Sequence, residues 1–146
     1  MSRCVTFLAI LFTVAALGCS RGPAMGTITG EVTYDGKPLS HGTILLEVSG
    51  QMLSRGEIEE GKIVNMTTFT PGDGAPVGEA VVAINSIAEV TTKRPNQSGN
   101  NGTGGSGEVM VQGQDLIPVR YSNPATSGLT ATIEPGVNDL HFDLTK

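Results

Sequence analysis

Apolar and polar positions alternate along most of the chain after residue 26, and this pattern predicts β-strands. From residue 27 to residue 34, every second position is apolar or glycine, and threonine or glutamate fills the positions between. Asp35-Gly36 follows as a hairpin turn, because glycine adopts positive φ without steric cost. A second alternating strand is expected over residues 43–48. The chain therefore opens its folded part with two strands joined by a tight turn.

The middle of the chain predicts three further strands. Residues 52–58 and 62–69 alternate weakly, and the loop 71–76 separates them from a more apolar segment. Residues 78–87 carry apolar side chains on both faces. Such a strand is either central in its sheet or an edge strand covered by a loop.

The last third of the sequence contains the strongest alternation. Residues 129–133 and 140–144 place apolar and polar side chains on opposite faces. Residues 108–111 are expected to resume a strand, and residues 116–121 to be extended, with Pro118 confining them to an edge or a bend. No helix is expected outside the N-terminal segment.

The N-terminal segment predicts export and lipidation. Residues 4–17 are continuously apolar after Arg3, too short a run for a membrane span and typical of a signal sequence. Ala16-Leu17-Gly18-Cys19 resembles a bacterial lipobox. We expect residues 1–18 to be a lipoprotein signal peptide, Cys19 to carry lipid, and residues 19–25 to be a tether. The alternative is an ordinary secretory signal with an incidental cysteine.

Residues 91–107 differ in composition from the rest of the chain. They are rich in glycine and asparagine and have no apolar residue large enough to pack. Such a segment cannot offset its ordering entropy, so we expect a flexible insertion at the end of a hairpin. Its glycines lack the spacing of a phosphate-binding loop.

Composition narrows the class of protein. The chain has 146 residues, which suggests one domain, and no tryptophan, so Val, Ile, Leu and Ala must form the core. The formal charge of −5 disfavours nucleic acid as a partner. Of the two cysteines, Cys4 is expected to leave with the signal and Cys19 to be acylated. The mature domain is then expected to have neither a disulfide nor thiol chemistry.

Two histidines are the first candidates for chemistry. His41 is expected in a polar turn, and His141 on the outward face of a strand between Asp139 and Asp143. A catalytic or metal-binding histidine needs a convergent carboxylate or a second ligand. The favoured interpretation of both is an exposed residue without a catalytic role.

Several carboxylates, one serine and two tyrosines are further candidates. Asp73 with Glu79, or Asp35 with nearby loop carboxylates, could bind calcium, but no EF-hand spacing is present. Ser127 lies in a turn sequence without the surroundings of a nucleophile. Tyr34 and Tyr121 could stack on a carbohydrate, although packing in the core is the favoured role.

Two regions carry a family resemblance. One is G-x-V-x-x-D-G-K-P-L-x-x-G-x-I at residues 30–44, and the other comprises residues 116–121, 126–129, 136–138 and 142–144. Together they resemble carboxypeptidase regulatory-like domains, and more closely the small transthyretin-like lipoproteins of the planctomycete type. The resemblance implies an all-β fold over residues 26–146, a single transthyretin-like (prealbumin-like) β-sandwich of about seven or eight antiparallel strands. It implies no catalytic residues.

These observations together predict a non-catalytic envelope lipoprotein whose β-sandwich is a structural or protein-interaction module. The alternative is a small ligand-binding module, for a glycan or calcium, displayed at the membrane surface. We expect no enzyme activity and no cofactor. The expected partners are the membrane, through the N-terminal lipid, and an envelope protein or glycan. By resemblance to known lipoproteins, Ser20 after the cysteine favours the outer membrane or periplasmic face.

Overall fold

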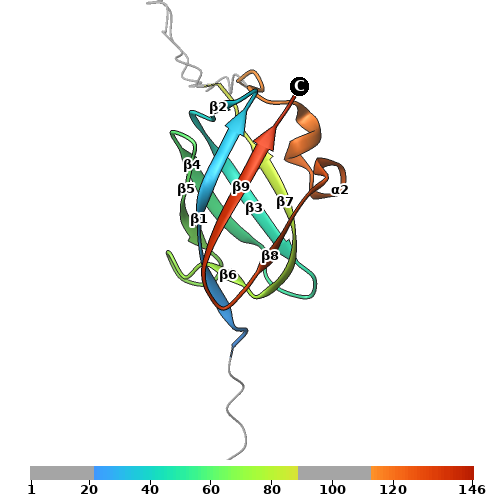
Figure 1. Ribbon diagram of the computed structural model, residues 1–146. Coiled ribbons are helices and arrows are strands. Elements are labelled where there is room, and N and C mark those ends of the chain that lie inside the picture. The colour runs from blue at the N-terminus through green and yellow to red at the C-terminus, as the bar shows by residue number, and fades with distance from the viewer. Residues whose placement is uncertain (1–21, 89–112) are drawn as a thin grey trace, which may run out of the picture.

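The computed structural model describes residues 22–88 and 113–146, and this part of the chain is mostly β-structure (Figure 1). One curled sheet contains the strands in the order β9-β1-β5-β4-β3-β7-β8, and two short strands, β2 and β6, also pair with β1. The bounds are β1 Met25–Tyr34, β2 Lys37–Pro38, β3 His41–Val48, β4 Ser54–Glu59, β5 Lys62–Thr67, β6 Ala75–Pro76, β7 Gly78–Asn85, β8 Leu129–Ile133 and β9 Gly136–Leu144. The predicted all-β class is confirmed.

The tight turn at Asp35-Gly36 forms as the sequence predicts, but it joins β1 to the short β2, whereas the expected second strand, β3, pairs with β4 and β7. Tyr34 pairs with Lys37 across a two-residue turn, in which Asp35 and Gly36 have φ values of 49° and 75°. Two successive positive φ values match the right-handed twist of the flanking strands. The strand after this hairpin begins at His41, two residues earlier than expected.

The first and last strands lie side by side and run in the same direction (Figure 1). This parallel pair extends from Gly26 opposite Gly136 to Tyr34 opposite Leu144, whereas all other paired strands are antiparallel. The expectation of antiparallel strands throughout was therefore wrong for β1 and β9. Gly30 permits their close approach, because a Cβ at this residue would lie 1.9 Å from the carbonyl oxygen of Leu140.

Strand β7 is central, as one of the two sequence interpretations required. It pairs with β3 on one side and with β8 on the other. Val82 and Ile84 are fully buried in the core, and Ala83 on the opposite face is buried as well. The short helical segment at residues 119–127 packs against β7. On the outer face Ala83 is thus covered, whereas Val81 remains 38% exposed.

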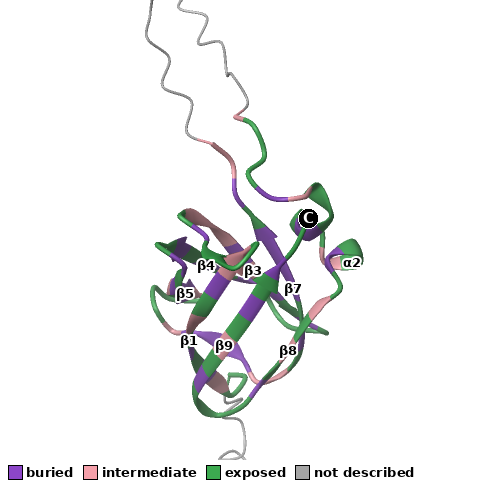
Figure 2. Cartoon of the chain, turned by 45° about the horizontal axis from the view of Figure 1, so that its top comes forward, coloured by how far each residue is buried: buried purple, intermediate pink, exposed green. Residues whose placement is uncertain are grey.

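The last two strands follow the predicted alternation (Figure 2). Ile133, Phe142 and Leu144 are buried, whereas His141 and Asp143 are exposed. The inward side chains join one core with those of the other strands. The strand register of β9 is therefore the expected one.

Residues 116–121 do not form the extended segment that was expected, and the expectation of no helix after the N-terminal segment was also wrong. Val119–Ser122 forms a 3₁₀-helix, η1, and Pro124–Ser127 forms a one-turn α-helix, α2. The Asn123 side chain caps α2 by accepting a hydrogen bond from the Ala125 amide at 2.9 Å. Proline is favourable in the first turn of a helix because it lacks only an amide hydrogen that would be unpaired there. Proline in this sequence therefore starts a helical turn instead of ending a strand.

Several predictions concern residues outside the described ranges. These are the signal peptide at 1–18, the lipid attachment at Cys19, the insertion at 91–107 and the strand at 108–111. Within residues 22–88 and 113–146, no helix is long and apolar enough to cross a membrane.

Candidate functional site

His41 lies at the start of β3, where its half-buried ring is held at both nitrogens. Nε2 lies 2.9 Å from the carbonyl oxygen of Ile87, and Nδ1 lies 3.0 Å from the Ser40 hydroxyl. A carbonyl can only accept, so Nε2 carries the hydrogen, and in the neutral ring Nδ1 accepts from Ser40. The sequence predicted that His41 lies in a polar turn, but it is the first residue of strand β3. The ring thus links the start of β3 to Ile87, two residues after β7 ends, and both of its nitrogens have hydrogen-bond partners.

A groove lies beside this histidine on the outer face of the sheet. An open hollow of about 390 Å³ spans β4, β3 and the end of β7. Its polar lining consists of His41, Thr43, Glu57, Glu59 and Asn85. We call this hollow the outer groove.

A second hollow, of about 210 Å³, shares two lining residues with the outer groove. It also contacts Thr43 and Asn85, and it adds Arg55, Leu45 and Ser122 of η1. The two hollows thus lie next to each other, and their combined strip of lining residues carries hydroxyl, amide, carboxylate and guanidinium groups. Such a strip can form hydrogen bonds with a polar ligand, but it has no nucleophile next to a free base.

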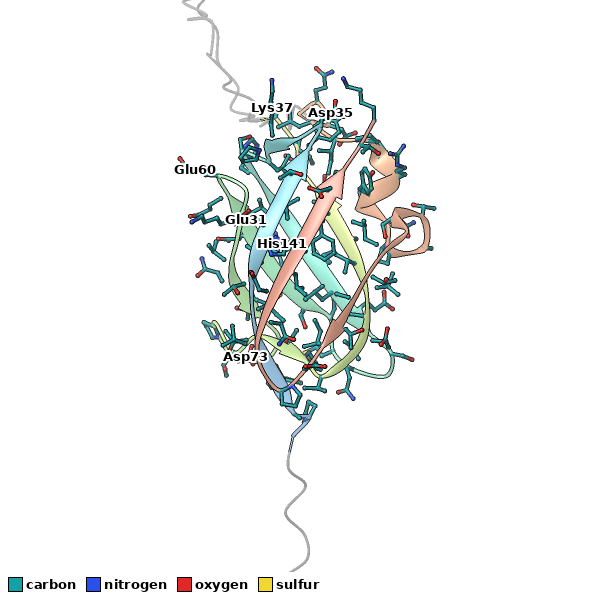
Figure 3. The ribbon with its side chains drawn as sticks, viewed as in Figure 1. Glu31, Asp35, Lys37, Glu60, Asp73 and His141 are labelled. Atoms are coloured by element: carbon teal, nitrogen blue, oxygen red, sulfur yellow. The ribbon has the colours of Figure 1, made fainter. Side chains whose placement is uncertain are left out.

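His141 has a carboxylate neighbour, as the sequence suggested, but no convergent site. Its Nε2 lies 3.1 Å from Asp139 Oδ2, and both side chains are more than half exposed. The other flanking carboxylate, Asp143, accepts a hydrogen bond from the Thr33 hydroxyl instead. Figure 3 shows His141 on the outer surface of the sheet. This pair is a surface contact of small energetic weight.

Asp73 organises the loop between β5 and β6. Its carboxylate accepts hydrogen bonds from the backbone amides of Thr68, Phe69 and Thr70 at 2.7–2.9 Å. Desolvation raises the pKa of this carboxyl, but the hydrogen bonds from Thr68, Thr70 and Phe69 outweigh it and hold the pKa below the ordinary 3.8. The observed role of Asp73 is to bind backbone amides of its own loop.

The other candidate calcium ligands have separate partners. Glu79 accepts from the Thr132 hydroxyl at 2.9 Å, and Asp35 pairs with the Lys146 ammonium at 2.7 Å. That contact raises the pKa of Lys146, first through the hydrogen bond and then through the charge of Asp35. Among the residues that the structure describes, no three His, Cys, Asp or Glu side chains are placed to hold a metal ion.

Ser127 lies at the end of α2 and is buried. Its hydroxyl donates to the carbonyl oxygen of Val82 at 2.5 Å and accepts from the Leu129 amide at 3.2 Å. These bonds attach the helical segment to β7. The Ser127 hydroxyl therefore has a structural partner both as a donor and as an acceptor.

The two tyrosines do not form a carbohydrate platform. Tyr121 is buried in the core, and Tyr34 is half-buried against it. The hydrogen bond from Thr145 and a second from Arg120 lower the pKa of Tyr121. The Arg120 guanidinium lies 4.7 Å from the centre of the ring and also donates to the Thr145 carbonyl at 2.6 Å. This cluster fixes the C-terminus after β9.

Asn138 is a structural residue that the sequence analysis missed. It is almost fully buried, and its side chain accepts from the Glu134 amide at 2.8 Å and donates to the Glu134 carbonyl at 2.9 Å. Its position two residues after Pro135-Gly136 is typical of an asparagine that stabilises a turn. The turn between β8 and β9 is therefore closed by a side chain.

Comparison with known proteins gives no relative. No protein-family model, no curated protein and no solved structure matches this chain.

Proposed function

We propose that this protein is a non-catalytic envelope lipoprotein, anchored through lipid on Cys19, whose β-domain is a structural or protein-interaction module. The observation that carries the proposal is Gly18-Cys19 at the end of a continuous apolar segment, six residues before β1 begins at Met25. A lipidated cysteine needs a short exposed junction between the membrane and the folded domain. The outer membrane or periplasmic face is the proposed location.

The finer fold assignment is part of the proposal. A transthyretin-like β-sandwich is supported by the motif at residues 30–44 and by a curled sheet with seven strands along its main path. In this arrangement the two halves of the curled sheet would face each other across the core. An experimental structure compared with transthyretin-like domains would test this assignment.

The non-catalytic character is supported by the hydrogen bonds of the candidate residues. His41 and Ser127 each bind a backbone carbonyl of another segment, and Asp73 binds backbone amides of its own loop. Groups with such roles hold the fold together, and a reaction would require them to leave their partners.

Replacing Cys19 tests the anchor, and the chain contains a matched control. Cys19→Ala is expected to move the protein from the membrane fraction to the soluble fraction. Cys4→Ala, inside the apolar segment, is expected to leave it in the membrane fraction. Mass spectrometry of the mature N-terminus would identify the acyl groups. Identical partitioning of the wild type and Cys19→Ala would refute the proposal.

The outer groove favours a second candidate, a glycan-binding module. Its hydroxyl, amide and carboxylate groups can form hydrogen bonds with sugar hydroxyls. A ligand that binds the native state raises the thermal midpoint. Cell-wall sugars are expected to raise it in the wild type and less in Asn85→Ala, with calcium chloride as a parallel arm. No shift with any sugar would exclude this candidate for the sugars used.

A further inference from the structure

Four large apolar side chains are exposed on three turns of the described chain. Met52 and Leu53, in the loop between β3 and β4, are 57% and 47% exposed. Phe69, in the loop between β5 and β6, is 50% exposed, and Val137, at the start of β9, is 78% exposed. Single exposed apolar residues are ordinary, but a group of them at one site marks a contact surface.

These turns lie at the same end of the molecule, where β1 begins (Figure 1). Figure 3 shows Asp73, from the same loop as Phe69, at this end, and Asp35, Lys37 and Glu60 at the opposite end. The pairing agrees, because Gly26 lies opposite both Ala75 and Gly136. We call the four side chains and this end of the domain the apolar end.

The expected lipid attachment lies within a short distance of the apolar end. The carbonyl of Ala24 accepts a hydrogen bond from the Val77 amide at 2.9 Å, so the chain is held to the domain from this residue onward. Cys19 lies five positions before Ala24, and a fully extended chain covers at most about 3.6 Å per position, or about 18 Å. A lipid on Cys19 would thus keep this end close to the bilayer surface.

We propose that the apolar end lies on the membrane, with Met52, Leu53, Phe69 and Val137 inserted among the lipid headgroups. This inference rests on the lipid anchor proposed above and adds the orientation of the domain. It explains why side chains of this size are exposed beside the start of β1. The occupant of this surface is the bilayer that holds the lipid.

The charges near this end specify the kind of lipid. Glu47, Glu79 and Glu134 are exposed near the same ends of their strands, and they outnumber the exposed Arg55 near the start of β4. Lys37, Lys62 and Lys146 lie at the other ends, beside the turns that follow β1, precede β5 and follow β9. Because acidic side chains repel anionic headgroups, the contact depends on apolar insertion into neutral lipid and not on charge attraction.

Depth-dependent fluorescence quenching tests the orientation. The mature lipidated protein is reconstituted into phosphatidylcholine vesicles that contain brominated acyl chains. An environment-sensitive dye is attached at Gln51→Cys, within the apolar end, or at Lys37→Cys, at the opposite end; both positions are exposed. We expect a blue shift and quenching for the dye at residue 51, and neither for the dye at residue 37. Equal signals at the two positions would overturn the inference.

A second comparison separates insertion from simple proximity. The changes Met52→Ser and Phe69→Ser are expected to abolish the quenching at residue 51, whereas Val119→Ser is expected to preserve it. Val119 is a suitable control because it is 65% exposed but belongs to η1. Unchanged quenching in the double variant would mean that the tether alone sets the distance, and the inference would be wrong.

Vesicle flotation and mass spectrometry distinguish the two proposals. Protein that lacks lipid on Cys19 and does not float with vesicles would overturn the lipoprotein proposal and this inference together. Lipidated protein that floats, but shows equal quenching at both dye positions, would leave the lipoprotein proposal standing and remove only the membrane-facing orientation.

Discussion

Phe142→Ala tests whether the C-terminal strand contributes to the core as its alternation indicates. Phe142 lies opposite Val32 of β1 and is only 6% exposed. A buried phenylalanine removes at least about 150 Å² from water, which corresponds to about 4 kcal/mol at about 25 cal/mol per Å². Measured phenylalanine-to-alanine changes in cores cost about 3–5 kcal/mol, including the cavity. This loss is a large share of the roughly 5–15 kcal/mol that stabilises a typical domain.

The neighbouring residue provides the control. The His141 side chain is 60% exposed, and its hydrogen-bond partner is the exposed Asp139 carboxylate. His141→Ala is therefore expected to change the free energy of unfolding by no more than about 0.5 kcal/mol. Both variants are compared with the wild type by urea unfolding. The dependence of the unfolding free energy on urea concentration should be the same in all three proteins, because it reflects the surface area exposed on unfolding. A harmless Phe142→Ala beside a costly His141→Ala would refute the register of β9. A large cost at both residues would refute the surface role of His141.

Three further variants test particular hydrogen bonds and contacts. Asp73→Ala is expected to cost about 1–3 kcal/mol at neutral pH because it leaves three amides without their acceptor. The pKa of Asp73 is lower when folded than the roughly 3.9 of an unfolded chain, so this contribution is present above about pH 4 and disappears as the pH falls through the folded value; urea midpoints at several pH values would check this. Asn138→Ala is expected to cost a similar amount in urea unfolding, whereas a change below about 0.5 kcal/mol would mean that water replaces its bonds to Glu134. Gly30→Ala is expected to lower the thermal midpoint strongly because of the 1.9 Å contact with Leu140 and a φ of 147°, and Gly36→Ala, where a Cβ meets no atom within 4 Å, should lower it less.

Local patterns predicted the features that depend only on residues close together in the sequence, such as a tight turn or the buried face of a strand. The turn at Asp35-Gly36 has a chemical requirement for positive φ, which both residues satisfy. The inward and outward faces of β8 and β9 follow from the two-residue period alone. The parallel pairing of β1 with β9 was not predictable in this way, because alternation shows which face is buried and not which strand lies alongside.

The candidate site was less predictable than the fold. Pro118 and Pro124 are compatible both with a bend and with a helical turn, and only the packing of Tyr121 and Ser127 against the sheet selects the turn. The roles of Asp73 and Asn138 depend on where particular backbone amides point. The amino-acid composition does not show where those amides point. Each residue does lie close to a turn sequence, however, and aspartate and asparagine in turns commonly bind nearby backbone groups.

The pairing of β1 with β9 also determines when the domain can finish folding. Partner residues in this pair lie 110 positions apart, so β1 has no partner on that side until residues 136–144 are available. Contacts between residues so far apart in the sequence form slowly, because the chain loses the entropy of closing a long loop before the new contacts stabilise it. During synthesis, the first strand would remain an unpaired edge on that side, open to pairing with another chain. Loss of residues 136–146, which include all of β9, would make that temporary state permanent.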